Sequence, residues 1–329
     1  MFNQKYSTIF FGTPEFAVPT LEKILTLPYL DLKAVVTQPD KPVGRQQVLT
    51  ASPVKALAQK KKLPILQPEK IKTDEFETQI RQLKPDVIIL VAYGKIIPKN
   101  LLAISKYGWL NLHASLLPKF RGASPIQFAI LEGAKETGVT LMKMDEGMDT
   151  GPIIVQEKIT MAPEETGQTL HDKLSRLSAE VLEKNLLAYL EGNLKPKTQD
   201  NSQATYTKII QKTDGKIDWQ KSASEIERQI RAFTPWPGTW CFWPRNQRAE
   251  QKVLTNSAIE QRLKIIQAGV SPDSVKLPPG QTKKSGESII VGCGQGNLEL
   301  QIIQLEGRKP QKVSDFLKGY PEFGNTKLE

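Results

Sequence analysis

Cysteine and histidine are scarce in this chain of 329 residues, with two of each: Cys241, Cys293, His113 and His171. Two cysteines are too few for a disulfide framework or a cysteine zinc site, so we interpret both as unrelated small buried side chains in a reducing compartment. No apolar run approaches the ~18 residues of a membrane span, and the first residues lack the layout of a signal peptide. We therefore expect a cytoplasmic protein without a membrane partner.

The composition is that of a folded protein. Hydrophobic residues make up 39% of the chain and charged residues 24%, which excludes wholesale disorder. A length of 329 residues is long for one hydrophobic core and suggests two domains. The polar stretch 192–205, GNLKPKTQDNSQAT, is typical of a linker. We accordingly predict a first domain at 1–190, a linker at 191–208 and a second domain at 209–329.

The positive charge is unevenly distributed. Of the net charge of +10, residues 205–329 contribute +6, with 19 Lys and Arg against 13 Asp and Glu. Residues 1–204 contribute +4, with 26 against 22. The shorter C-terminal part is therefore the more basic, which suits a polyanionic partner such as nucleic acid. A basic balance also serves solubility alone, so it does not identify the partner by itself.

Strand and helix patterns alternate along the N-terminal part. They predict strands at 6–11, 32–36, 63–66, 87–91, 138–144 and 153–160 and helices at 16–25, 52–62, 74–83, 126–132 and 168–190. This alternation predicts an α/β fold with a doubly wound, mostly parallel sheet. The first turn has one glycine, Gly12, and lacks the further glycines of a G-x-G-x-x-G site, which argues against a dinucleotide cofactor.

Two segments outside this alternation also have expected structures. Residues 37–49 contain two prolines and a glycine and are predicted to form a loop, to which Lys41 and Arg45 give positive charge. From Trp240 onward short strands alternate with Gly/Pro turns, which is typical of a small β-barrel. The glycine-rich run 292–296 has no strand–helix frame around it, so we interpret it as a hairpin turn.

The stretch 109–122, WLNLHASLLPKFRG, carries the most informative polar pattern. It begins as a strand, and because strands alternate their faces, Asn111 and His113 project to the same side near the strand end. In open α/β sheets, ligands bind at that carboxyl end. A lone histidine in an apolar strand is more often a core residue than a catalyst. The neighbouring amide, the irregular loop that follows and the scarcity of histidine favour a catalytic role; we interpret His171 as a surface residue.

Several blocks in order and spacing resemble the folate-dependent formyltransferases. The blocks are NLHASLLPKFRGASPIQ from residue 111 and MDEGMDTGPII from residue 144. Three further blocks, FFGTPEFAVPTLEKI, TQPDKPVGR and SPVKALA, narrow the resemblance to the branch of that family that acts on methionyl-tRNA. It extends from residue 6 to about residue 243. It implies a Rossmann-like sheet followed by an OB-like C-terminal barrel that binds tRNA.

The resemblance also implies roles for individual residues. Asn111, His113 and Asp149 match the family's catalytic set, whereas Asp149, in a loop bounded by Gly147 and Gly151, would otherwise be interpreted as a turn residue. The cofactor-binding residues implied are Ser115, Leu116, Leu117, Pro118, Gly94 and Ile96. The basic loop implies contacts of Lys41 and Arg45 with tRNA, although Gln46 and Gln47 stand where the family tends to have lysines. The formyl donor implied is 10-formyltetrahydrofolate, and no metal is expected.

The amine acceptor has more than one candidate. The first is the α-amino group of methionyl initiator tRNA, favoured by the basic loop and the basic C-terminal part. The second is an amino-sugar nucleotide, because sugar-modifying relatives share the catalytic trio and the PWPG segment at 235–238. The third is no acceptor at all, in an idle RNA-binding protein on the same scaffold; the intact trio argues against it. We expect a monomer.

Overall fold

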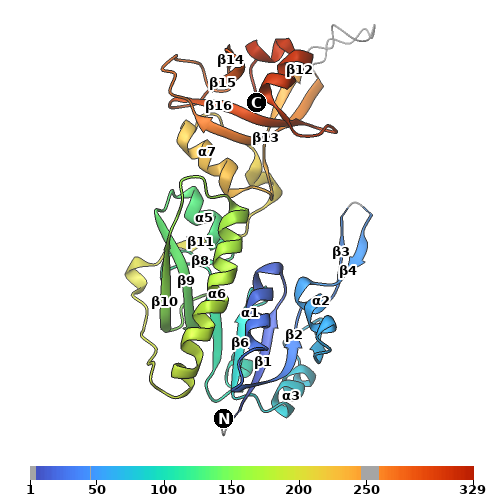
Figure 1. Ribbon diagram of the computed structural model, residues 1–329, viewed down its shortest axis with the longest axis vertical. Helices are drawn as coiled ribbons and strands as arrows, with labels where there is room; N and C mark the ends of the chain where they lie inside the picture. The colour runs from blue at the N-terminus through green and yellow to red at the C-terminus, as the bar shows by residue number, and fades with distance from the viewer. Residues whose placement is uncertain (1–4, 45, 246–258) are drawn as a thin grey trace. The chain divides into compact units, whose positions relative to one another are not determined.

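The computed structural model describes residues 5–44, 46–245 and 259–329 (Figure 1). The chain divides into two compact units. The first unit is made of Met1–Pro125, Lys135–Met161 and Thr169–Lys208, and the second of Ile126–Ala134, Ala162–Gln168 and Ile209–Glu329. The second unit therefore includes most of helix α5 (Pro125–Leu131) and the first residues of helix α6 (Gly167–Leu190), which precede residue 209 in the sequence.

A seven-stranded sheet forms the centre of the first unit. Its strands lie in the order β10 (Ile153–Thr160), β9 (Glu136–Lys143), β7 (Trp109–His113), β6 (Val87–Val91), β1 (Tyr6–Gly12), β2 (Leu30–Val36) and β5 (Ile65–Leu66). The five strands from β7 to β5 pair in parallel, whereas β9 pairs antiparallel with both β7 and β10. The predicted fold class, a doubly wound and mostly parallel α/β sheet, is confirmed.

Helices connect these strands. Those of the first unit are α1 (Val18–Ile24), α2 (Pro53–Lys60), α3 (Asp74–Gln82), α4 (Lys99–Leu102) and most of α6, with short 3-10 helices η1 (Glu15–Ala17) and η2 (Asn201–Gln203). Helix α2 begins where Ser52 and Pro53 predict it, because the Ser52 side chain accepts a hydrogen bond from the Lys55 N–H. Strand β6 is buried at all five positions, as a continuous apolar run predicts for a central parallel strand.

The parallel strands bring several loops to one edge of the sheet. The register pairs Gly12 with Val91 and Leu90 with Asn111, so β1, β6 and β7 end at the same edge. The chain also changes direction there, because β2 follows on one side of β1 while β6 lies on the other. Such a switch point at the carboxyl ends of strands is the usual ligand position in open α/β sheets.

The prediction of an irregular loop at 37–49 is wrong in part. Strands β3 (Lys41–Val43) and β4 (Val48–Thr50) pair antiparallel as a hairpin that stands away from the sheet (Figure 1). Gly44 and Gln47 adopt positive φ angles of 74° and 51°, which reverses the chain between the two strands. Pro42 removes one backbone donor and counts against a strand, but an isolated two-stranded hairpin has free edges that tolerate it.

An antiparallel sheet dominates the second unit. Its strands are β12 (Thr239–Arg245), β13 (Ile259–Val270), β16 (Asn297–Leu305), β15 (Ser288–Gly292) and β14 (Thr282–Ser285), with β17 (Gln311–Lys312) paired to β16. Besides most of α5 and the start of α6, this unit contains the helical elements α7 (Ala223–Ala232), α8 (Val313–Gly319), η3 (Lys212–Gly215) and η4 (Pro321–Asn325). Gly292 pairs with Asn297, so the turn at 292–296 is a hairpin, as predicted.

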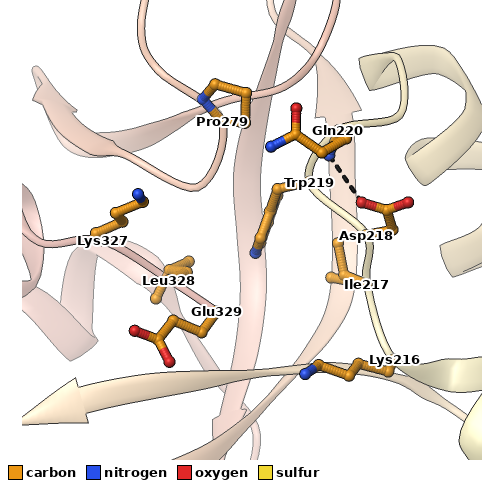
Figure 2. Close-up of a pocket in the computed structure, with 9 residues that line it drawn as sticks. All are labelled: Lys216, Ile217, Asp218, Trp219, Gln220, Pro279, Lys327, Leu328 and Glu329. Carbon is orange, nitrogen blue, oxygen red and sulfur yellow. Dashed lines mark hydrogen bonds between the residues drawn. The ribbon is translucent and has the colours of Figure 1, made fainter.

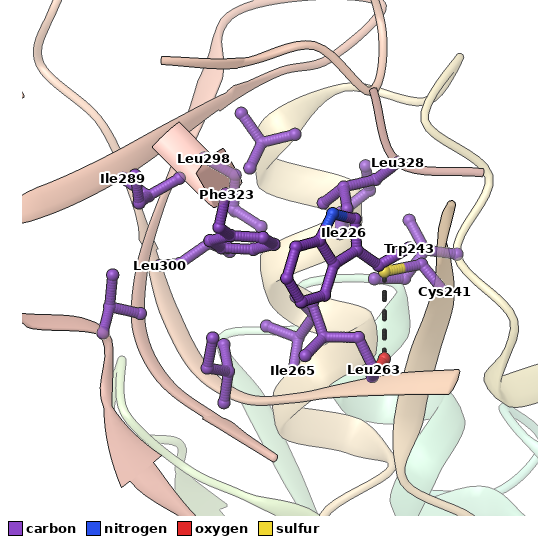
Figure 3. Packing of buried hydrophobic residues seen from close by; sticks show 14 of the residues in the cluster. Ile226, Cys241, Trp243, Leu263, Ile265, Ile289, Leu298, Leu300, Phe323 and Leu328 are labelled. Carbon is purple, nitrogen blue, oxygen red and sulfur yellow. Dashed lines mark hydrogen bonds between the residues drawn. The ribbon is translucent and has the colours of Figure 1, made fainter. Parts of the chain in front are cut away.

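The core of the second unit forms between this sheet and its helices. Figure 3 shows Trp243 of β12 among aliphatic side chains of the neighbouring strands, with Ile226 contributed by α7. Cys241 and Cys293 are both buried free thiols, which confirms their interpretation as small core side chains. Burial raises the pKa of both thiols, that of Cys293 to about 12. Within the part of the chain described, no helix is long and apolar enough to cross a membrane.

Candidate active site

Strand β7 places two polar side chains in a buried position. All five residues of β7 are buried, including Asn111 at 8% exposure and His113 at 6%. The strand lies between β6 and β9, so its residues have backbone partners on both sides. Buried polar side chains need hydrogen-bond partners, and in this part of the chain the loops supply them.

The loop after β9 brings Asp149 to these two residues. Asp149 Oδ2 accepts a hydrogen bond from the Gly122 N–H at 2.8 Å and lies 3.6 Å from His113 Nδ1. Its Oδ1 lies 3.5 Å from Asn111 Nδ2. The structure therefore brings together the three residues that the sequence proposes as catalytic, with the carboxylate between the amide and the imidazole. Asp149 has a positive φ of 54°, an uncommon conformation for a residue other than glycine.

The other ring nitrogen of His113 faces a backbone carbonyl. His113 Nε2 lies 2.9 Å from the carbonyl oxygen of Phe120. A carbonyl oxygen only accepts hydrogen bonds, so this contact assigns a proton to Nε2 and leaves Nδ1 as the nitrogen facing Asp149. Phe120 has a positive φ of 59°. Sequence reasoning missed Phe120, because the contribution comes from its backbone and not from its side chain.

Side chains of strands β9 and β10 hold the segment 115–118 by hydrogen bonds. Thr140 Oγ1 donates to the Ser115 carbonyl at 2.6 Å and accepts from the Leu117 N–H at 3.1 Å. Gln156 Nε2 donates to the Leu117 carbonyl at 2.8 Å. Neither Thr140 nor Gln156 was predicted, because polar residues on β9 and β10 have no motif that identifies them.

The side chains of this segment differ in accessibility. Ser115 is fully buried and its hydroxyl donates to the Lys119 carbonyl at 2.6 Å, and the Leu117 side chain is 3% exposed. Leu116 and Pro118 are partly exposed. A ligand at this segment would therefore meet Leu116, Pro118 and main-chain groups, while Ser115 and Leu117 shape the loop from inside.

The turn after β6 carries the two remaining cofactor-binding candidates. Gly94 has a positive φ of 80°, and a Cβ there would lie 2.7 Å from Gln38 Nε2, so both conformation and space favour glycine. Ile96 is 80% exposed. The Tyr93 carbonyl accepts hydrogen bonds from Gln38 Nε2 at 2.7 Å and Thr13 Oγ1 at 3.2 Å. The loops that follow β1, β2 and β6 are thus connected through the carbonyl oxygen of Tyr93.

The hairpin that contains Lys41 is anchored at its base. Asp40 lies 2.6 Å from Lys55 Nζ and accepts a hydrogen bond from Gln67 Nε2 at 2.9 Å. These two hydrogen bonds lower the pKa of the Asp40 carboxyl group. Lys41 is exposed and its Nζ donates to Gln38 Oε1 at 2.9 Å, while Arg45 lies outside the described residues.

One cavity of about 480 Å³ lies in the second unit (Figure 2). It is lined by Lys216, Ile217, Asp218, Trp219, Gln220, Pro279, Lys327, Leu328 and Glu329. None of these is a predicted site residue, and the cations and carboxylates of the lining largely balance. Figure 2 shows the Trp219 indole between Gln220 and Leu328. Over the described residues, no group of three His, Cys, Asp or Glu side chains is placed to hold a metal ion.

Comparison with known proteins identifies the family. Residues 6–186 match the family described as formyl transferase, and residues 209–321 match the formyl transferase C-terminal domain. The chain belongs to the formyl transferase family. The methionyl-tRNA formyltransferase of Geobacter sulfurreducens is 43% identical over 321 residues, covering 97% of this chain and 96% of that relative. The methionyl-tRNA formyltransferase of Myxococcus xanthus is 45% identical over 313 residues, covering 95% of this chain and 94% of that relative.

Two solved structures share the fold of this chain. WlaRD, a sugar 3N-formyl transferase crystallised in the presence of dTDP and 5-N-formyl-THF, has a TM-score of 0.62 at 21% identity, covering 93% of this chain and 100% of that one. HypX from Aquifex aeolicus in complex with tetrahydrofolic acid has a TM-score of 0.58 at 16% identity, covering 98% of this chain and 48% of that one. At these identities the likeness shows the fold alone.

Proposed function

We propose that this formyl transferase moves the formyl group of 10-formyltetrahydrofolate to the α-amino group of methionyl initiator tRNA. The observation that carries the proposal is the Asp149 carboxylate between Asn111 and His113, in a chain that matches methionyl-tRNA formyltransferases over nearly its whole length. The product, N-formylmethionyl-tRNA, starts translation, so we expect the enzyme to act in the cytoplasm, and to act as a monomer.

The reaction needs an oxyanion donor and a route for one proton. The amine nitrogen attacks the formyl carbon, a tetrahedral oxyanion forms, and the bond from that carbon to N10 of the folate then breaks. One proton leaves the attacking nitrogen and one is delivered to N10. The enzyme must therefore stabilise negative charge on oxygen and move protons between nitrogens. An amide, an imidazole and a carboxylate together supply the hydrogen-bond donors and the proton-transfer groups for this.

The geometry divides these tasks between the three residues. The Asn111 amide carries two N–H groups, and one of them faces Asp149, which leaves the other for the oxyanion. The Nε2 edge of His113 is occupied by Phe120, so proton transfer belongs to the Nδ1 edge and to Asp149, which faces it. Asp149 is partly exposed, at 17% of its side chain, and is therefore the member of the trio that most readily meets an incoming amine.

We assign donor binding to the edge of the sheet where the loops converge. Leu116, Pro118, Gly94 and Ile96 offer main-chain groups and accessible apolar surface that suit a flat pterin, and Ser115 and Leu117 fix the loop that presents them. Lys41, together with Arg45 of the same hairpin, is assigned to the aminoacyl end of the tRNA. In this scheme residues 1–190 carry out the chemistry, 191–208 connect the two parts, and 209–329 bind tRNA.

An amino-sugar nucleotide is the alternative acceptor and is not favoured. The relatives that are 41–45% identical are named methionyl-tRNA formyltransferases. The sugar formyltransferase with a similar structure is 21% identical. This difference in sequence identity favours methionyl-tRNA as the acceptor, although the methionyl-tRNA and the sugar formyltransferases share the same kind of fold.

A single-turnover assay with two acceptors tests the proposal. The enzyme is mixed with 10-formyltetrahydrofolate and either methionyl initiator tRNA or a dTDP-linked amino sugar, and formyl transfer is followed by radiolabel. We expect rapid transfer to the tRNA and none to the sugar. Transfer to the sugar in preference to the tRNA would overturn the proposed acceptor, and transfer to neither would overturn the proposed reaction.

A further inference from the structure

Residues 199–207 lie against both sides of the catalytic trio. The short strand β11 (Tyr206–Thr207) pairs in parallel with β8 (Arg121–Gly122), directly after Phe120. Thr207 Oγ1 donates to the Arg121 carbonyl at 3.1 Å and accepts from the Ser124 N–H at 3.1 Å. A stretch whose composition is that of a linker is therefore bound along the edge of the site.

One end of this stretch supports the Asp149 loop. Gln199 Nε2 donates to the carbonyl oxygens of Asp149 at 2.9 Å and Gly151 at 2.7 Å. Gln199 is 6% exposed, and its Oε1 accepts from Arg121 Nη2 at 2.7 Å. Arg121, itself 1% exposed, also donates to Asn201 Oδ1 at 2.7 Å. Since Asp149 has an unfavourable positive φ, these bonds help to hold the backbone that aims its carboxylate at His113.

The other end supports Phe120. The Phe120 N–H donates to Thr205 Oγ1 at 2.8 Å, and the Arg121 N–H donates to the Thr205 carbonyl at 2.9 Å. Phe120 also has a positive φ, and its carbonyl is the partner of His113 Nε2. Thr205 therefore fixes the backbone on both sides of the carbonyl group that orients the imidazole.

We propose that Gln199 and Thr205 are positioning residues for formyl transfer, each fixing one of the two groups that face the ring nitrogens of His113. Gln199 acts through Asp149 and Thr205 acts through Phe120; neither is assigned a contact with substrate. The inference rests on the proposed function for its kinetic consequence, but the geometric part stands on these hydrogen bonds alone. Small misplacements of reacting groups cost large factors in rate, which makes the effect measurable.

Four substitutions separate positioning from general stability. Thr205→Val removes the hydroxyl at an exposed position and keeps the shape, while Thr205→Ser keeps the hydroxyl. Gln199→Met removes the amide and keeps the length of the side chain. Gln203→Ala is the matched control, because Gln203 lies in the same segment, is exposed and donates a side-chain hydrogen bond to Asp200 at 2.9 Å.

The kinetic readout is the division between kcat and KM. We expect Thr205→Val and Gln199→Met to lower kcat roughly 10-fold or more, with KM for the folate donor and for tRNA within about twofold of wild type. Thr205→Ser and Gln203→Ala should stay close to wild type. Unchanged kcat in Thr205→Val and Gln199→Met would overturn the proposal, and so would equal losses in Thr205→Val and Thr205→Ser.

A second readout does not depend on activity. The chain has two histidines, so ¹⁵N–¹H spectra of the imidazoles contain two spin systems, which His171→Asn assigns. Thr205→Val should shift the Nε2 resonance of His113, and Gln199→Met its Nδ1 resonance, with His171 unchanged. If both His113 resonances stay in place in folded variants, the positioning role is refuted. If they shift while the wild-type enzyme leaves methionyl-tRNA unformylated, the proposed function is wrong and the positioning role stands.

Discussion

His113 Nε2 lies 2.9 Å from the Phe120 carbonyl oxygen, while His113 Nδ1 lies 3.6 Å from Asp149 Oδ2. Both nitrogens of one buried imidazole thus face groups that accept hydrogen bonds, one neutral and one a carboxylate. This arrangement fixes the orientation of the ring before any substrate binds. It also leaves the edge that faces Asp149 as the one at which a proton can be exchanged.

Replacing Asp149 by asparagine should reduce the rate of formyl transfer by at least ~10²-fold, the usual scale for losing an acid–base group. An amide has nearly the same shape, so the hydrogen bond from Gly122 can persist, but it can neither balance a charged imidazole nor take up a proton. Steady-state kinetics measures the loss. Asp145→Asn is the control, since Asp145 is exposed in the same loop and bonds to Gly147 and Thr150. Comparable losses in both variants would leave Asp149 with a turn role only.

Replacing Ile96 by glutamate should weaken binding of the folate donor. Ile96 is 80% exposed in the turn after β6, so the change leaves the core intact, and it adds a carboxylate to a surface assigned to an anionic, partly apolar ligand. Calorimetric titration of the donor should show a Kd increased about 10-fold or more. Val270→Glu, at a 53% exposed apolar position in the second unit, should bind the donor as wild type does. Equal affinity in all three proteins would put the folate elsewhere.

Lys41→Glu should weaken binding of methionyl-tRNA and make it less sensitive to salt. If Lys41 contacts a phosphate, its loss should reduce the slope of log affinity against log salt by about one contact. Filter-binding measurements between low and moderate salt give the slope. Lys60→Glu, at an exposed position near the end of α2, carries the same charge change and should alter the slope less. Equal effects of the two substitutions would show that the hairpin contributes only to the overall electrostatic attraction between the protein and tRNA.

The pair formed by Asp40 and Lys55 should make the free energy of unfolding depend on pH in the acidic range. Hydrogen bonds from Lys55 and Gln67 lower the pKa of Asp40 in the folded protein below its unfolded value near ~4. The stabilisation is therefore complete above that unfolded value and is lost as the pH falls through the lower folded value. Urea denaturation of Asp40→Asn should show a reduced free energy of unfolding at pH 7 and a smaller decrease between pH 7 and pH 3 than wild type. Lys55→Met should behave in the same way; parallel curves for wild type and Asp40→Asn would contradict the assignment.

The sequence predicts those parts of the molecule that depend on local pattern. The run at 87–91 predicts a buried central strand, and the period of two places Asn111 and His113 on one face of β7, because burial and alternation are properties of the strand itself. The cap at Ser52 has the same local origin. The prediction of a catalytic role for Asp149 rests on the resemblance, since nothing in the sequence around Asp149 distinguishes a catalytic carboxylate from a turn residue.

The remaining features depend on contacts between distant segments. Phe120 contributes a backbone carbonyl in an unfavourable conformation, which side-chain type does not reveal. Gln199 and Thr205 lie in a polar stretch whose composition predicts a linker, and their partners are many residues earlier in the chain. The hairpin of β3 and β4 was missed because Pro42 argues against a strand. Proline is tolerated in edge strands, but the sequence does not show that β3 lies at an edge.

The most direct test of the central claim is the single-turnover rate of formyl transfer from 10-formyltetrahydrofolate to methionyl initiator tRNA by wild type, Asn111→Ala and His113→Ala. We predict that each substitution lowers the rate by at least ~10²-fold, while the affinities for folate and tRNA change little, because the first removes an oxyanion donor and the second the proton-transfer group. A variant that folds, binds both substrates and keeps most of the wild-type rate would contradict the assignment of the catalytic centre.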